Sequence, residues 1–170
     1  IYLQQPGLSL QLLGEYEQAI QDLDLAIELD PDYADAYDSR GLVFLDMAAY
    51  EEAMADFDQA IALDPNLAYA YANRGYGYYV LGEYEKAIQD LDRAIELNPE
   101  EANAFDSRGS AYHSLRDYEQ ARADFDQAIT VDPEFVYAYQ NRGLLNYSVG
   151  EYEQAIADYG QALELDPGNA

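Results

Sequence analysis

An all-α solenoid of five 34-residue helix–turn–helix units is the fold that this sequence predicts. Proline returns every 34 residues, each time directly after Asp or Asn, and glycine and tyrosine keep the same period. The positions are Pro31, Pro65, Pro99, Pro133 and Pro167; Gly7, Gly41, Gly75, Gly109 and Gly143; and Tyr16, Tyr50, Tyr84, Tyr118 and Tyr152. A fixed period of this size along a whole chain is typical of solenoid repeats. We expect a single domain of units 1–33, 34–67, 68–101, 102–135 and 136–169.

Each unit shows two stretches with helical spacing of apolar or small residues, which in the second unit begin at Ala34 and Tyr50. Three other units carry glycine between the two stretches, namely Gly14, Gly82 and Gly150. Glycine there indicates the end of a helix, because it adopts the left-handed conformation without steric cost. The Asp-Pro pair ends the second helix, since a residue before proline is disfavoured in the α region. Each unit is therefore predicted to be helix, tight turn, helix and short loop.

Small residues on both helices should let the helices of one unit approach closely. In the second unit these are Gly41, Ala53 and Ala60, and the large Tyr37 and Phe57 are expected to fill the space around them. One such pair of helices cannot bury its apolar face alone, so neighbouring units must stack.

This order of residues resembles the tetratricopeptide repeat family over the full chain. The residues that carry the resemblance in the second unit are Tyr37, Gly41, Phe44, Tyr50, Ala53, Phe57, Ala60 and Pro65. The resemblance implies a right-handed superhelix whose first helices line a concave groove for a peptide or a partner segment, and it implies no catalytic activity. The carboxylate clamp of some members is not expected, because the matching positions are acidic, small or aromatic apart from Asn73 and Asn141.

The net charge of −26 limits the classes of partner. It disfavours nucleic acid, whose phosphates would be repelled, and it favours cationic proteins, peptides or bound cations. No signal peptide or apolar run long enough to cross a membrane is visible, so we expect a soluble protein, either cytoplasmic or exported. The chain begins with Ile1 rather than Met, which leaves open whether a leader precedes it.

Residues for catalysis or metal binding are scarce. The chain has no cysteine and one histidine, His113, so we expect no catalytic residues, no metal site and no cofactor. Pairs of the form Asp-x-Asp recur at Asp22/Asp24, Asp56/Asp58, Asp90/Asp92 and Asp124/Asp126. They are not expected to bind calcium, because residues two apart on a helix point to different sides and the glycine of a calcium loop is missing.

Four arginines share one position of the repeat, and an aspartate follows each of them 16 residues later. The pairs are Arg40 with Asp56, Arg74 with Asp90, Arg108 with Asp124, and Arg142 with Asp158. We predict partly buried ion pairs between the two helices of a unit, since a buried carboxylate is costly alone and a guanidinium can bind it twice. The alternative is that the arginines point into the groove and hold an anionic ligand. Pro6 replaces the arginine of the first unit, so Asp22 should be unpaired and that unit a frayed end or an altered segment.

The units alternate in type with a longer period of 68 residues, so the groove should alternate in chemistry. The candidate groove residues are Tyr69, Asn73, Tyr76, Tyr79, Tyr137, Asn141, Leu144, Tyr147, Asp38 and Asp106. Exposed tyrosines bind partners efficiently, because they offer large apolar faces with little entropy to lose. The two asparagines could hydrogen-bond a peptide backbone. The alternative is that the tyrosines pack against the next repeat.

Our leading hypothesis from these residues is a non-enzymatic protein–protein interaction scaffold that binds a peptide or extended segment. The alternative is a structural protein, because neither end shows a polar capping helix. The chain is then either part of a longer array or stacks head-to-tail into a filament, with cations or salt to screen its charge.

Two positions stay open at this level. Asn146-Tyr147-Ser148 fits the acceptor pattern for N-glycosylation, which matters only in a secreted protein. Arg122 replaces the apolar residue of the other units, and the sequence offers no reason for it.

Overall fold

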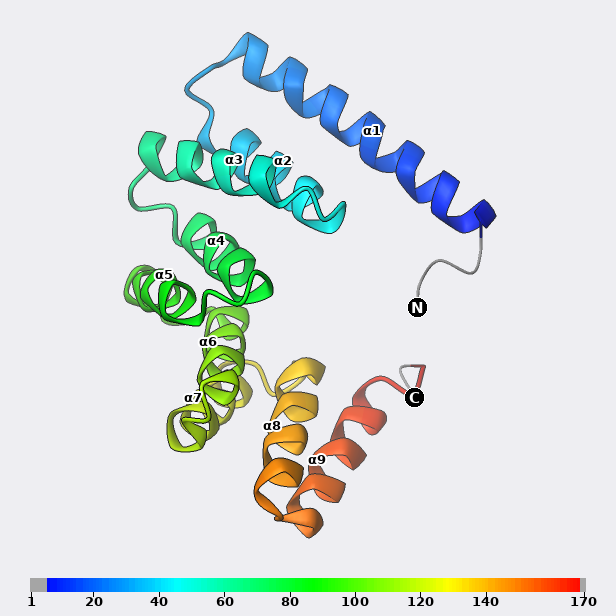
Figure 1. Cartoon of the computed structure of the whole chain (residues 1–170), viewed down its shortest axis with the longest axis vertical. Helices are drawn as coiled ribbons and strands as arrows, with labels where there is room; N and C mark the ends of the chain where they lie inside the picture. Colours follow the sequence, from blue (N-terminus) through cyan, green and yellow to red (C-terminus); the bar gives the residue numbers. More distant parts are fainter. Residues whose placement is uncertain (1–5, 169–170) are drawn as a thin grey trace.

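The computed structural model describes residues 6–168, with side chains from Gly14 onward. Nine α-helices and no strand make up this part of the chain. The helices are α1 (Pro6–Leu29), α2 (Ala34–Asp46), α3 (Tyr50–Leu63), α4 (Ala68–Val80), α5 (Tyr84–Leu97), α6 (Ala102–Ser114), α7 (Tyr118–Val131), α8 (Val136–Val149) and α9 (Tyr152–Leu165) (Figure 1). None of the helices within the described range is both long and apolar enough to span a lipid bilayer.

The helices form a one-dimensional array of pairs. Within units, α2 packs on α3, α4 on α5, α6 on α7 and α8 on α9, and α3, α5 and α7 each contact the first helix of the next unit. The first helices α2, α4, α6 and α8 also contact one another in sequence, whereas the described second helices do not. The path is a curved, open arc with α1 and α9 at its ends (Figure 1). The first helices therefore lie on the inner face of an all-α repeat solenoid.

Glycine on each first helix permits the close approach that the sequence predicts. A Cβ atom on Gly41 would lie 2.7 Å from Cε1 of Phe57, and one on Gly109 would lie 2.7 Å from Cε1 of Phe125. Both phenylalanines are almost completely buried. In these two units a phenylalanine ring packs directly against the backbone of the first helix, and Leu91 and Tyr159 pack in the same way at Gly75 and Gly143.

The turns after α4 and α8 follow the prediction made from their glycines. Gly82 and Gly150 have φ angles of +79° and +86°, in the left-handed region. Ala48 and Arg116 adopt the same conformation in the other two turns, with φ angles of 58° and 64°. The left-handed turn is therefore required by the packing of the two helices, since non-glycine residues accept its steric cost.

The first unit differs from the prediction of a helix–turn–helix. Its described part is one 24-residue helix, α1, which runs through Gly14 without a turn. The turn predicted at this glycine is therefore wrong. A turn forms where two helices gain by packing together, and Pro6 stands in this unit where the others carry the arginine that joins their helices. Asp22, predicted to be unpaired, accepts a hydrogen bond from Nε2 of Gln18 at 3.0 Å.

Candidate functional site

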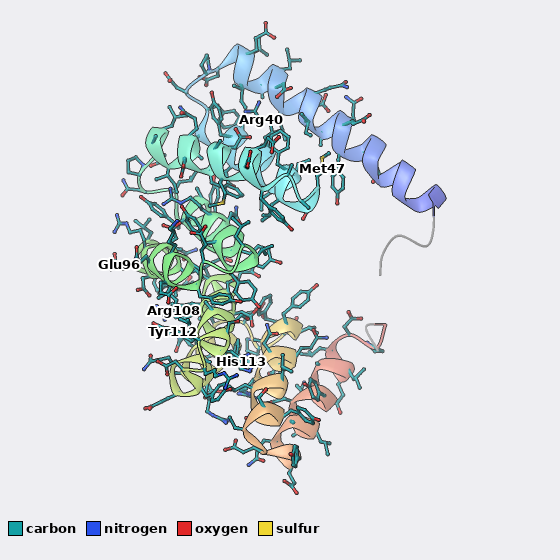
Figure 2. All side chains as sticks on the ribbon, in the orientation of Figure 1. Arg40, Met47, Glu96, Arg108, Tyr112 and His113 are labelled. Carbon is teal, nitrogen blue, oxygen red and sulfur yellow. The ribbon has the colours of Figure 1, made fainter. Side chains whose placement is uncertain are left out.

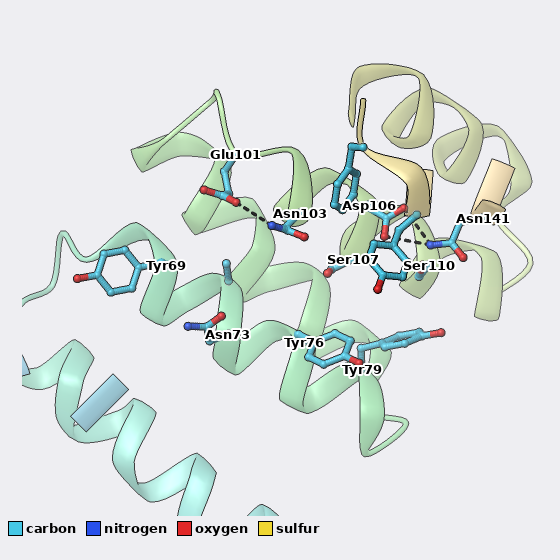
Figure 3. Close-up of a pocket in the computed structure, with 13 residues that line it drawn as sticks. Tyr69, Asn73, Tyr76, Tyr79, Glu101, Asn103, Asp106, Ser107, Ser110 and Asn141 are labelled. Atoms are coloured by element: carbon cyan, nitrogen blue, oxygen red, sulfur yellow. Dashed lines mark hydrogen bonds between the residues drawn. The ribbon is translucent and has the colours of Figure 1, made fainter. Parts of the chain in front are cut away.

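A hollow of about 550 Å³ opens on the inner face of the array. It lies between α4, α6 and α8, and its lining includes Tyr69, Asn73, Tyr76, Tyr79, Asp106, Tyr137 and Asn141 (Figure 3). These seven are among the ten candidate groove residues, so the structure brings most of the candidates together. Three successive units contribute to one site.

The hollow exists because a unit with short side chains lies between two units with long ones. Three of the α6 positions that line the hollow hold short side chains, namely Asn103, Ser107 and Ser110. The same positions one repeat earlier are Tyr69, Asn73 and Tyr76, and one repeat later they are Tyr137, Asn141 and Leu144. Because of the 68-residue alternation, the longer side chains of α4 and α8 stand on either side of the shorter side chains of α6.

Three of the lining tyrosines have exposed rings, with exposed fractions of 42% for Tyr69, 46% for Tyr76 and 58% for Tyr137. Tyr79 is half-buried, because its ring stacks on Tyr76 at 6.2 Å between centroids and tilts against Tyr84 at 5.9 Å. Burial raises the pKa of the Tyr79 hydroxyl. The exposed rings offer contact area, while the Tyr79 ring packs against Tyr76 and Tyr84.

Asn73 and Asn141 contact the previous unit, in addition to lining the hollow. Nδ2 of Asn73 donates to both carboxylate oxygens of Asp38, at 3.0 and 3.1 Å. Nδ2 of Asn141 donates in the same way to Asp106, at 2.9 and 3.0 Å. The amide nitrogens that were expected to bind a peptide backbone therefore join neighbouring first helices.

Asp38 and Asp106 are buried, with exposed fractions of 3% and 9%. Burial raises the pKa of each carboxyl to about 6, against a smaller opposing effect of the asparagine amide. Asp106 reaches the hollow and Asp38 does not. Sequence reasoning missed this pairing, although the 35-residue separation of each Asp from its Asn is a repeat plus one residue.

Leu144 and Tyr147 are exposed but lie outside the lining of the hollow. The Tyr147 ring contacts Tyr152 at 5.6 Å between centroids. These two candidates extend the apolar surface along α8 beyond the hollow.

All four predicted Arg–Asp ion pairs are present, and each arginine uses Nε and Nη2 on the aspartate of its own unit. For Arg74 and Asp90 the distances are 2.6 and 2.8 Å, and for Arg108 and Asp124 they are 2.9 and 2.6 Å. Figure 2 labels Arg40 and Arg108, which occupy this position in two of the units. The arginines are occupied by these aspartates, which supports the structural role over binding of an anionic ligand.

The third guanidinium nitrogen makes a contact that the sequence analysis missed. Nη1 of each arginine binds an aspartate of the preceding unit, at 2.5 to 2.6 Å. The contacts are Arg40 with Asp24, Arg74 with Asp58, Arg108 with Asp92, and Arg142 with Asp126. The Asp-x-Asp pattern was the available signal: its first aspartate binds within the unit, and its second binds the next unit.

The two open positions also have structural roles. Arg122 pairs with Glu151 across units, with Nη2 and Oε2 2.7 Å apart. Asn146 is buried, and its Nδ2 donates to Oδ2 of Asp158 at 2.8 Å. A glycan on Asn146 is incompatible with this buried position.

His113 lies on α6 outside the hollow. Its Nε2 is 3.3 Å from Oγ of Ser148, and its ring tilts against Tyr118 at 5.5 Å. Burial lowers the pKa of the His113 imidazole. Its contacts are with the neighbouring helices.

Comparisons with known proteins agree with this architecture. A tetratricopeptide repeat profile matches residues 68–101 and 136–169, and a TPR repeat profile matches residues 7–47, 49–82 and 109–150. No curated protein matches the sequence.

Similar solved structures cover almost the whole chain. The crystal structure of MamA is 27% identical with a TM-score of 0.75, covering 98% of this chain and 97% of that one. Pseudomonas aeruginosa pilF is 28% identical with a TM-score of 0.80, covering 94% and 73%. YrrB, described as a TPR protein with an unusual peptide-binding site, is 26% identical with a TM-score of 0.68, covering 94% and 82%. With its repeat period, helix pairs and profile matches, the chain belongs to the tetratricopeptide repeat family.

Proposed function

We propose that this protein is a non-enzymatic interaction scaffold whose inner hollow binds an extended segment of a partner protein. The observation that carries this proposal is the hollow itself, which exposes tyrosine faces from two units on either side of a polar floor. Tyrosine rings bury large apolar area at small entropic cost and keep a hydroxyl for hydrogen bonding. Tetratricopeptide repeat proteins typically act as scaffolds without catalysis, and YrrB is described as having a peptide-binding site.

The charge of the chain favours a cationic partner segment. The net charge is −26, and the residues that line the hollow include Glu101 and Asp106 but no lysine or arginine. A cleft lined by charge of one sign attracts partners of the opposite sign. Binding should therefore weaken as ionic strength rises.

A displayed library of random peptides tests the proposal. We expect peptides to be enriched on the native chain and lost on a Tyr69→Ala/Tyr137→Ala variant. Tyr152→Ala is the matched control, because this ring is also exposed, at 55%, but lies outside the hollow. No enrichment above background, or equal enrichment on both variants, would rule out the hollow as a peptide site.

The alternative function, self-association, is favoured by one specific surface. On α9 the exposed fraction of Ile156 is 72% and that of Leu163 is 44%. The same positions of the third unit, Ile88 and Ile95, are partly buried against a core that includes α6 residues. A second copy that covered the α9 face would continue the stacking seen inside the chain.

Light scattering on the 170-residue chain across protein concentration and ionic strength tests this alternative. Association should strengthen with salt, because the two acidic chains repel one another. Ile156→Lys should prevent it, whereas Glu164→Lys, an exposed position on the same helix, should not. A chain that stays monomeric under all conditions would rule out self-association and leave the interaction scaffold as the remaining function.

A further inference from the structure

Glu101 departs from the repeat at a position that lines the hollow. It is the residue directly before α6, and the same position in the other described pairs holds Tyr33, Leu67 or Phe135. A carboxylate therefore stands where the array otherwise places an apolar side chain.

The contacts of Glu101 do not explain this departure. Its side chain makes no capping hydrogen bond to the start of α6. Oε1 accepts a hydrogen bond from Nδ2 of Asn103 at 3.2 Å, and a carboxylate has about four acceptor positions. Asp106, by contrast, is buried and receives Asn141 on both oxygens. Glu101 is thus the carboxylate of the hollow with acceptor capacity for a ligand.

Two exposed rings line the same hollow as this carboxylate. Tyr69 precedes Asn103 by one repeat and Tyr137 follows it by one repeat, so the three occupy the same position on adjacent first helices. Figure 3 shows Glu101 and Asn103 at the start of α6, with Tyr69 on the neighbouring helix α4. The face of a tyrosine ring attracts a cation, and more so where water is partly excluded.

The chain already holds its own guanidinium groups by the same combination of ring and carboxylate. Arg74 lies over the Tyr71 ring at 5.7 Å while it binds Asp90, and Arg142 lies over Tyr139 at 5.7 Å. The lining of the hollow offers tyrosine and carboxylate together and includes no basic residue. The chemistry of the site is therefore complementary to a guanidinium.

We propose that the hollow holds an arginine side chain of the partner segment, bound to Glu101 and stacked on Tyr69 or Tyr137. The proposal rests on the function proposed above. Arginine is favoured over lysine, because a planar guanidinium can stack on a ring and bind a carboxylate with two hydrogen bonds at once.

The first test is an NMR titration with two small probes, N-acetylarginine amide and N-acetylcitrulline amide. Citrulline keeps the length and planar end of arginine but carries no charge. We expect the arginine probe to shift the ring signals of Tyr69 and Tyr137 and the citrulline probe to shift them far less. Equal shifts from both probes, or shifts of other tyrosines only, would overturn the proposal.

The second test separates local contact from overall charge. Glu101→Gln and Glu100→Gln remove the same charge from adjacent residues, but only Glu101 lines the hollow. We expect Glu101→Gln to lower the affinity for the arginine probe by about fivefold, which is the upper range for a solvent-exposed ion pair. Glu100→Gln should leave this affinity nearly unchanged. Equal loss in the two variants would show attraction by net charge and would overturn the assignment to Glu101.

The peptide library distinguishes failure of this proposal from failure of the scaffold function. Peptides that bind through Tyr69 and Tyr137 without enrichment of arginine would leave the scaffold and remove the arginine site. Binding of the arginine probe without any enriched peptide would support the cation site and remove the extended-segment function.

Discussion

Asn73 donates its amide nitrogen to both carboxylate oxygens of Asp38, and so joins the first helices of two successive units. Asn141 and Asp106 repeat the contact two units later. Both carboxyls are buried, and neither receives the guanidinium that every other fully buried aspartate in the described range receives. These two inter-unit contacts should therefore respond to pH.

The Asp38→Asn/Asp106→Asn variant should be more stable than the native chain at pH 7.5 and not at pH 4. Burial raises both folded-state pKa values to about 6, above the unfolded value of about 3.9, so the folded chain binds more protons between these limits. The stability that depends on these two carboxyls is fully present below pH 3.9 and is lost as the pH rises through 6. Above pH 6 the free energy of unfolding is therefore lower by up to about 3 kcal/mol for each carboxyl.

Urea unfolding followed by circular dichroism at several pH values measures this difference. Asp46→Asn, an exposed position on α2, is the control for loss of a charge. A native chain and double variant with parallel pH profiles would contradict the prediction.

Arg108→Leu should lower the free energy of unfolding by about 3 kcal/mol or more, because it leaves Asp124 buried without a cation. Asp124→Leu in addition should restore most of the loss, since an apolar pair replaces the ion pair. Thermal and urea unfolding of the single and double variants check this. Additive losses in the double variant would show that the pair does not act as a unit.

Replacing Asp58, Asp92 and Asp126 together by Asn should make unfolding clearly less cooperative, while the free energy of unfolding falls only slightly. These half-exposed aspartates bind the arginine of the next unit, and each such contact contributes about 1 kcal/mol or less. A repeat array unfolds together only while its interfaces are strong. The slope of the free energy of unfolding against urea concentration should fall. The control is a variant in which three exposed residues, Glu100, Glu134 and Glu164, are changed to Gln. An unchanged slope would contradict this.

Gly109→Ala should destabilise the chain by about 1–3 kcal/mol, because the new methyl group would lie 2.7 Å from the Phe125 ring and 3.2 Å from the Ala121 carbonyl oxygen. Gly160→Ala is the matched comparison, since it lies within α9 with nothing within 4 Å of the added Cβ. That change should stabilise by about 0.5–1 kcal/mol. Melting temperatures that move in the same direction for both variants would refute the packing explanation.

The sequence alone determined the features that repeat within one unit. The 34-residue period, the helix pair, the close contact at Gly41 and the Arg40–Asp56 pair depend on residues of a single unit, so their spacing was sufficient to predict them. The tyrosines Tyr69 and Tyr137 could be placed on a groove for the same reason.

Only the tertiary structure decided the features that depend on how units stack. The second contact of each arginine, the burial of Asp38 beside Asn73 and the hollow at Glu101 need the distance between neighbouring first helices, which no single unit contains. The first unit shows the same limit, because Gly14 continues α1 where an identical signal ends a helix elsewhere. Local residues favour a turn, but packing of two helices against each other is what stabilises it.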